Sequence, residues 1–113
     1  MDCIFCKIVQ GEIPSKKVYE SKLVVAFEDI NKVAPVHVLV IPKAHYDSLM
    51  EIPVSETELM VELIHAIQEV ARVTGVAETG FRVITNKGRS AGQSVFHQHF
   101  HVIGGRDLDI KLG

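Results

Sequence analysis

Three histidines alternate with other residues near the end of the chain, in the segment His97-Gln98-His99-Phe100-His101-Val102. Extended backbone repeats every two residues, so this pattern predicts a strand whose three imidazoles share one face while Gln98, Phe100 and Val102 share the other. A single strand histidine is more typical of a hydrogen-bonded residue at the edge of a core. Histidine can transfer protons, act as a nucleophile or bind a metal near neutral pH. Three in register therefore predict a face that carries chemistry.

Composition limits the kind of protein to which this segment can belong. With 113 residues, of which 47% are hydrophobic and 23% charged, the chain has the size and composition of one globular domain over residues 1–113. The formal net charge of −2 argues against nucleic acid or an anionic membrane as a partner. The sequence has neither an apolar run of roughly 20 residues, which a membrane span needs, nor a secretory signal pattern, so we expect a cytoplasmic protein.

The rest of the pattern predicts an antiparallel α+β domain with one sheet of about five strands. The strand at 36–41 is almost entirely apolar, which indicates burial on both faces. The expected elements are a short N-terminal helix over 4–10, strands over 17–20, 23–27, 36–41, 80–86 and 98–103, and one long helix over 55–74.

The long helix has predicted signals at both ends. Ser55 and Glu58 have the spacing of a capping box, and Val54 with Leu59 has that of a hydrophobic staple. Gly75 suits the C-terminal stop. The apolar stripe covers about half the circumference, so the helix is expected either to lie deep in its own core or to pack also on a partner chain. The stripe consists of Leu59, Met60, Leu63, Ile64, Ile67, Val70, Ala71 and Val73.

A polar loop with two glycines, residues 87–94, directly precedes the three histidines. Glycines allow backbone N–H groups to approach an anion closely, and Gln93 and Ser94 add side-chain donors. Such a loop alone is more often a plain turn. Beside aligned imidazoles it predicts a phosphate site, in which an imidazole attacks phosphorus and the donors stabilise charge on the oxygens.

The two cysteines, Cys3 and Cys6, form a Cys-x-x-Cys pair. In a reducing compartment this spacing indicates half of a metal site or a redox pair. A redox pair belongs in a βαβ pattern, which the sequence around it lacks, so the metal interpretation is favoured. A metal-free pair of small buried thiols remains the alternative.

Ordered matches over nearly the whole chain resemble one known family. On these residues the chain resembles the histidine-triad (HIT) proteins, and within them the Hint-like branch of purine nucleoside phosphoramidate hydrolases. The resemblance implies the HIT fold, with a purine mononucleotide substrate, and usually a homodimer whose long helices and sheets adjoin. The matching segments are Phe27-Glu28-Asp29-Ile30, residues 34–43, Asn86 and residues 92–106.

The same resemblance implies a mechanism and a site. His99 would attack the α-phosphate of a nucleotide and form a covalent nucleotidyl-histidine that water then hydrolyses. His101 would bind phosphate and position the attack, while His37 would support His99 through a hydrogen bond. Ser94 would also assist the departing amine. The implied nucleotide contacts are Phe27 and Ile30 at the base, Asp29 at the ribose hydroxyls, Asn86 beside the phosphate, Gln93 and Ser94 at phosphate oxygens, together with Gly92, Val95, His99 and His101.

Each of the isolated polar residues also has a plain structural interpretation. Asp29 could cap the turn that follows it, and Asn86 could be an ordinary loop residue. His37 could be a buried histidine bonded to backbone. Gln98 occupies a spacer position that is often apolar in the family, so it needs a polar partner on the far face, for example across a dimer.

Some bacterial and archaeal members of the family extend a Cys-x-x-Cys pair into a zinc site. They use the histidine after the Ile-Pro-Lys segment, here His45, and the first histidine of the triad, here His97. The resemblance therefore implies a structural Zn²⁺ held by Cys3, Cys6, His45 and His97. That site would leave His99 free, and catalysis would require no metal.

These observations lead to three hypotheses for the function of the chain. The first is a hydrolase or nucleotidyl transferase acting on purine nucleoside 5′-phosphoramidates. The second is a module that binds purine nucleotides or a protein partner with little turnover. The third assigns the histidines to a catalytic metal, which is disfavoured because His97 belongs with the cysteines and the motif contains no Asp or Glu to complete an open site.

Overall fold

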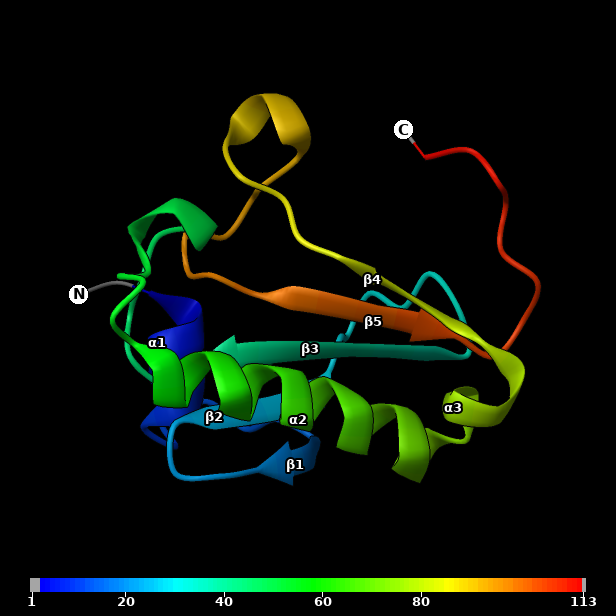
Figure 1. The fold of residues 1–113 in the computed structure, drawn as a ribbon, viewed down its shortest axis with the longest axis horizontal. Helices are drawn as coiled ribbons and strands as arrows, with labels where there is room; N and C mark the ends of the chain where they lie inside the picture. The colour runs from blue at the N-terminus through cyan, green and yellow to red at the C-terminus, as the bar shows by residue number, and fades with distance from the viewer. Residues whose placement is uncertain (1–2, 113) are drawn as a thin grey trace.

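A computed structural model describes residues 3–112 of the chain (Figure 1). It confirms the predicted α+β class: one five-stranded sheet with a long helix and a short N-terminal helix. The strand order is β1-β2-β3-β5-β4, and all four neighbouring pairs are antiparallel. The elements are α1 (Ile4–Val9), β1 (Lys17–Glu20), β2 (Val24–Glu28), β3 (Val36–Pro42), η1 (Leu49–Glu51), α2 (Thr57–Thr74), α3 (Val76–Thr79), β4 (Phe81–Ile84), η2 (Arg89–Ala91) and β5 (Phe100–Gly104).

The two faces of the sheet are covered by different helices. Helix α2 runs across one face and α1 packs against the other (Figure 1). Because side chains alternate along a strand, β2 and β3 supply both cores. This confirms the predicted burial of β3 on both faces. The α2 core includes Val24, Ala26, Val38, Val40, Leu63 and Val70, and the α1 core includes Val25, Phe27, Leu39, Ile41, Phe5 and Ile8.

The predicted N-terminal cap of the long helix is wrong, whereas its C-terminal stop is confirmed. Helix α2 is capped by Glu56, and this residue makes no side-chain capping bond. The Glu56 N–H donates to the Pro53 carbonyl at 3.0 Å, so residues 54 and 55 form an exposed turn instead of a cap and staple. At the other end Gly75 has φ +86°, a conformation that glycine adopts without strain.

The wide apolar stripe of α2 is only partly buried. Its centre packs on the sheet, but Met60 and Ile64 are 37% and 59% exposed. They lie together on the helix surface with Val61, an apolar residue beside the stripe that is 69% exposed. We call these three residues the α2 patch. The chain's own core therefore does not account for the width of the stripe. None of the helices within residues 3–112 is both long and apolar enough to cross a membrane.

Strand β5 begins two residues later than predicted, so residues 97–99 precede the sheet. Side-chain bonds replace the missing ladder bonds there. Nε2 of Gln98 donates to Oγ1 of Thr85 at 2.7 Å, and that hydroxyl donates to the carbonyl of His99 at 2.8 Å. Gln98 therefore has a polar partner in its own chain. Its Oε1 is buried and accepts no hydrogen bond from residues 3–112.

Candidate functional site

A cavity of about 660 Å³ opens on the α1 face of the sheet, and two of the three histidines line it. In the β3–β5 register His101 lies opposite Leu39, whose side chain belongs to the α1 core, so His101 points to that face. The rings of His99 and His101 have centroids 5.0 Å apart. Seven residues of the predicted nucleotide site line this cavity, namely Phe27, Asp29, Ile30, Ser94, Val95, His99 and His101. The other three predicted residues, Asn86, Gly92 and Gln93, do not line the cavity.

Helix α1 forms one wall of the cavity, which the sequence did not indicate. Ile4, Phe5 and Ile8 all line it. The ring of Phe5 meets His99 edge-on, with centroids 5.2 Å apart and an interplanar angle of 88°. The apolar spacing of these residues marks one helix face. Nothing in a local pattern, however, could place that face against His99, which lies more than 90 positions away.

The protonation of His99 follows from its single hydrogen bond. Nδ1 lies 2.7 Å from the main-chain oxygen of His97. A carbonyl oxygen only accepts, so Nδ1 must carry the proton, and in the neutral ring Nε2 then holds the lone pair. No donor among residues 3–112 bonds to Nε2. His99 is thus a buried imidazole beside the cavity with an available ring nitrogen, as a nucleophile requires.

His37 bonds to His101 and not to His99, which corrects the predicted contact. Val33 N–H donates to Nδ1 of His37 at 3.2 Å, so the neutral His37 ring carries its proton on Nε2. That Nε2 lies 2.9 Å from Nδ1 of His101 and 3.2 Å from a carboxylate oxygen of Asp29. Nδ1 of His101 therefore accepts, and its Nε2–H remains as a donor.

Asp29 caps the turn that follows it, as the plain structural interpretation expects, and it also contacts His37. One carboxylate oxygen caps the following turn by accepting from Asn31 N–H at 2.8 Å, and the other contacts His37. Asp29, His37 and His101 thereby bring ligand atoms within 4.8 Å of one another. The tertiary structure thus supplies the carboxylate that the histidine motif lacks. The hydrogen bonds already account for the close approach of the three groups.

Burial keeps the inner histidines neutral. Burial, together with the neighbouring rings of His99 and His37, lowers the pKa of His101 to about 4, and Asp29 opposes the shift. Burial also lowers the pKa of His37. Both rings are therefore uncharged near neutral pH, which preserves the hydrogen bond between them.

We expect this arrangement to make folding sensitive to acid. Unfolded His101 binds a proton near its ordinary pKa of about 6.5, whereas the folded residue does so near about 4. The free energy of unfolding should therefore fall as pH decreases from about 6.5 to 4, and be insensitive to this group above that range. Urea denaturation of wild type and His101→Gln between pH 7.5 and 4.5 measures the effect. The variant should lose less stability, and equal losses would contradict the assignment.

Gln93 holds the glycine loop together. Its side-chain oxygen accepts from Gly88 N–H at 2.8 Å, and its amide nitrogen donates to the carbonyls of Asp47 at 2.6 Å and Val95 at 3.1 Å. The side chain is only 4% exposed. Its donors are therefore engaged within the protein, and the exposed hydroxyl of Ser94 is the side-chain donor of this loop that reaches the cavity.

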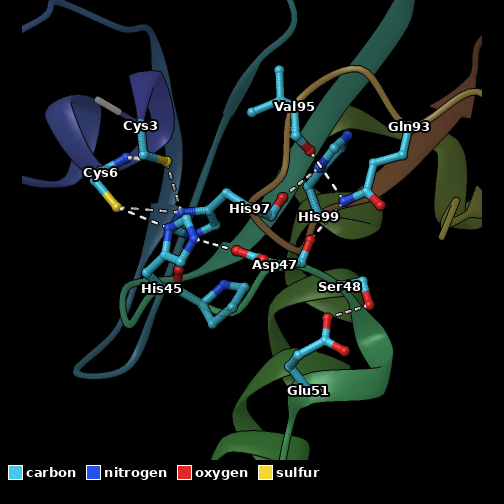
Figure 2. Close-up of polar contacts among 11 residues, drawn as sticks. Cys3, Cys6, His45, Asp47, Ser48, Glu51, Gln93, Val95, His97 and His99 are labelled. Atoms are coloured by element: carbon cyan, nitrogen blue, oxygen red, sulfur yellow. Dashed lines mark hydrogen bonds and ion pairs between the residues drawn. The ribbon is translucent and has the colours of Figure 1, made fainter. Parts of the chain in front are cut away.

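Cys3, Cys6, His45 and His97 come together in a second cluster, with ligand atoms within 4.8 Å of one another (Figure 2). Sγ of Cys3 lies 3.3 Å from Nδ1 of His97, and Sγ of Cys6 lies 3.3 Å from Nδ1 of His45 and 3.5 Å from that of His97. In tetrahedral zinc, bonds of about 2.3 Å to sulfur and about 2.0 Å to nitrogen place the two ligand atoms about 3.5 Å apart. The spacing fits such an ion.

The outer contacts of the two histidines also suit a metal. Nε2 of His97 lies 2.8 Å from the carbonyl of Pro42, and Nε2 of His45 lies 2.7 Å from the carboxylate of Asp47. Both acceptors require the proton on Nε2, which leaves the Nδ1 lone pairs directed at the cysteines. Metal-binding histidines are oriented in this way in metalloproteins.

The fold and the site together define a small α+β protein with a buried imidazole beside one cavity and a separate cluster of two cysteines and two histidines close enough to hold a metal ion. A family comparison gives the same result, because the HIT domain matches residues 10–108. The chain belongs to the HIT domain family.

Individual relatives extend over almost all of the chain. The purine nucleoside phosphoramidase of Escherichia coli K12 is 39% identical over 111 residues, which cover 98% of this chain and 93% of the relative. Protein HitA of Neisseria gonorrhoeae is 43% identical over 91% of this chain and 95% of its own length. The structure of a HIT family hydrolase from Clostridium thermocellum has a TM-score of 0.94 at 47% identity, covering 98% of this chain and 96% of that one.

Proposed function

We propose that this chain hydrolyses purine nucleoside 5′-phosphoramidates through a covalent nucleotidyl-His99. The observation that carries the proposal is the state of His99, whose Nδ1–H is bound to a carbonyl and whose Nε2 has a lone pair beside the cavity. The E. coli relative named a purine nucleoside phosphoramidase supports the choice of substrate class.

Two displacements at phosphorus give the reaction. In the first, the Nε2 lone pair of His99 forms a bond to the α-phosphorus, the P–N bond breaks, and the leaving amine takes up a proton that the Ser94 hydroxyl relays from solvent water. In the second, water attacks phosphorus and releases a proton to solvent, the bond to His99 breaks and a nucleoside monophosphate leaves. The Nε2–H of His101 would donate to a phosphate oxygen throughout, which lowers the energy of both transition states.

The other predicted residues that line the cavity would contact the ribose, the base and the phosphate. Asp29 would accept the ribose hydroxyls, because a carboxylate has acceptor sites beyond those used by Asn31 and His37. Phe27 and Ile30 would contact the purine, and Val95 would lie beside the phosphate. In this proposal Gln93 supports the glycine loop, and Asn86, Gly92 and Gln93 do not contact substrate.

Trapping the intermediate tests the proposal directly. The protein is mixed with adenosine 5′-phosphoramidate, quenched in base within milliseconds to seconds and digested, and the peptide containing His99 is examined for an adenylyl adduct. The adduct and release of AMP are expected. Nucleotide binding without adduct or release would favour the binding module. Turnover abolished immediately by a chelator would favour a catalytic metal at Asp29, His37 and His101.

We further propose that the ion held by Cys3, Cys6, His45 and His97 is a structural Zn²⁺. Two thiolates and two imidazoles satisfy four-coordinate zinc completely, so no position is left for water or substrate. Such an ion would tie α1 to the segments that carry His45 and His97.

The chain is also expected to form a homodimer through the α2 patch. Three neighbouring apolar side chains on a helix surface gain free energy when a second copy covers them. We therefore expect Ile64→Asp to convert a dimer into a monomer in sedimentation velocity. His65→Asp, on the neighbouring exposed position, is the control for added charge. A wild type that sediments as a monomer at micromolar concentration would contradict this prediction.

A further inference from the structure

Asp47 lies between the metal ligands and the glycine loop, and neither predicted site includes it. Its carboxylate accepts a hydrogen bond from Nε2 of His45 at 2.7 Å. Its main-chain carbonyl accepts one from Nε2 of Gln93 at 2.6 Å. Figure 2 shows both contacts, with Asp47 between the cysteine and histidine cluster and Gln93. A single residue thus joins a metal ligand to the loop that precedes the histidines.

The bond to His45 is the contact that orients the Asp47 side chain. This side chain is 63% exposed, so packing does not hold it. The next residue, by contrast, is a buried anchor: the Ser48 hydroxyl donates to Glu51 at 2.6 Å and accepts from Met50 N–H at 3.1 Å. The position of the Asp47 backbone is therefore set by Ser48 on one side and by His45 on the other.

Gln93 connects the Asp47 backbone to the glycine loop through hydrogen bonds. Besides the bond to Asp47, its side-chain oxygen accepts from Gly88 N–H at 2.8 Å, and its own N–H donates to the Gly88 carbonyl at 3.0 Å. The loop is thus closed around the Gln93 amide. Ser94, which lines the cavity, is the next residue in the chain.

A second bond fixes the far end of the same segment. The carbonyl of Tyr46 accepts from Gln98 N–H at 2.7 Å. Residues 45–48 therefore hold both Gln93 and Gln98, and the chain between them contains Ser94 and the metal ligand His97. A shift of residues 45–48 would move the hydroxyl at the cavity and, through His97, the carbonyl that holds His99.

We propose that Asp47 is a positioning residue that couples the metal site to the glycine loop. When an ion occupies Nδ1 of His45, the ring is fixed, Nε2–H holds the Asp47 carboxylate, and the Asp47 carbonyl then holds Gln93 and Ser94 in place. The carboxylate in turn keeps the proton on Nε2 and makes His45 a better ligand. The consequence for catalysis rests on the proposed hydrolysis, whereas the coupling itself rests only on the proposed Zn²⁺ site.

The test compares Asp47→Ala and Asp47→Asn with Glu56→Ala, which removes an exposed carboxylate that makes no capping bond. Zinc affinity is measured by competition with a chromophoric chelator, hydrogen exchange of Gly88 N–H by NMR, and AMP affinity by calorimetry. Asp47→Ala should weaken zinc binding about 10- to 100-fold, speed exchange at Gly88 and raise the Kd for AMP. Asn keeps an acceptor oxygen, so Asp47→Asn should restore part of the Gly88 protection.

Removing zinc from wild type should also speed hydrogen exchange of Gly88 N–H. Glu56→Ala should change neither zinc affinity, nor Gly88 exchange, nor AMP affinity. The proposal would be overturned if Asp47→Ala bound zinc within twofold of the wild-type affinity. It would also be overturned if neither the substitution nor zinc removal changed hydrogen exchange of Gly88 N–H. If wild type binds no AMP, the proposed function fails, but zinc affinity and Gly88 exchange still decide the coupling.

Discussion

Replacing His99 with alanine is expected to lower kcat/KM for adenosine 5′-phosphoramidate by about 10³-fold or more, because the substitution removes the nucleophile itself. Only binding and the phosphate donors would remain to accelerate the reaction. Steady-state release of AMP measures the change. The covalent adduct should disappear together with turnover, since no other residue between 3 and 112 places an available imidazole nitrogen at this position.

Two controls separate a chemical effect from a structural one. His65→Ala removes an imidazole that is 57% exposed on α2, far in the sequence from the site, and should leave kcat/KM unchanged. AMP affinity should fall less than turnover in His99→Ala, because Ser94 and His101 still face the cavity. A variant that retains turnover within a few fold of wild type would remove His99 as the nucleophile.

Loss of the metal should have the second large effect, on stability. Protein purified without chelator should contain about one zinc per chain, and Cys6→Ser should lose it and melt roughly 10 °C or more below wild type. Cys3 and His97 are 94 positions apart, so an ion that joins them closes a very long loop and restricts the unfolded chain strongly. Metal analysis and thermal unfolding measure the two quantities.

Chelator provides the matched comparison for that substitution. Wild type treated with chelator and Cys6→Ser treated in the same way should have nearly equal melting temperatures, because the ion then contributes to neither protein. A large remaining difference would show that the thiol stabilises the fold by packing. Well under one zinc per chain in untreated wild type would contradict the metal assignment.

The sequence predicted much of the site because several of its signals are local. Period-two alternation placed Phe100 and Val102 on one face and His101 on the other, and the ligand spacing of known family members brought Cys3 and Cys6 together with two distant histidines. The strand prediction failed at residues 97–99. There the chain leaves the sheet, and bonds to Thr85 and Tyr46 replace ladder bonds.

Errors arose where an outcome depended on a neighbour distant in the sequence. A capping box needs only the right residue types, yet the turn at Pro53 placed Ser55 outside the helix. Gln93 has the donors that a phosphate needs, yet carbonyls of Asp47 and Val95 already accept from them. A local sequence pattern reveals neither the turn at Pro53 nor the carbonyls that accept from Gln93.

By itself the sequence determined most of the elements, the sheet face on which His101 lies and the residue types available for phosphate and metal, since periodicity and turn chemistry are local properties. Only the tertiary structure decided which side chains meet. The β3–β5 register sets His37 diagonally beside His101 instead of His99, and the path of residues 45–48 sets Asp47 between the metal ligands and the glycine loop. Hydrogen bonds extend only about 3 Å, so register and chain path, which no local pattern encodes, select the partners.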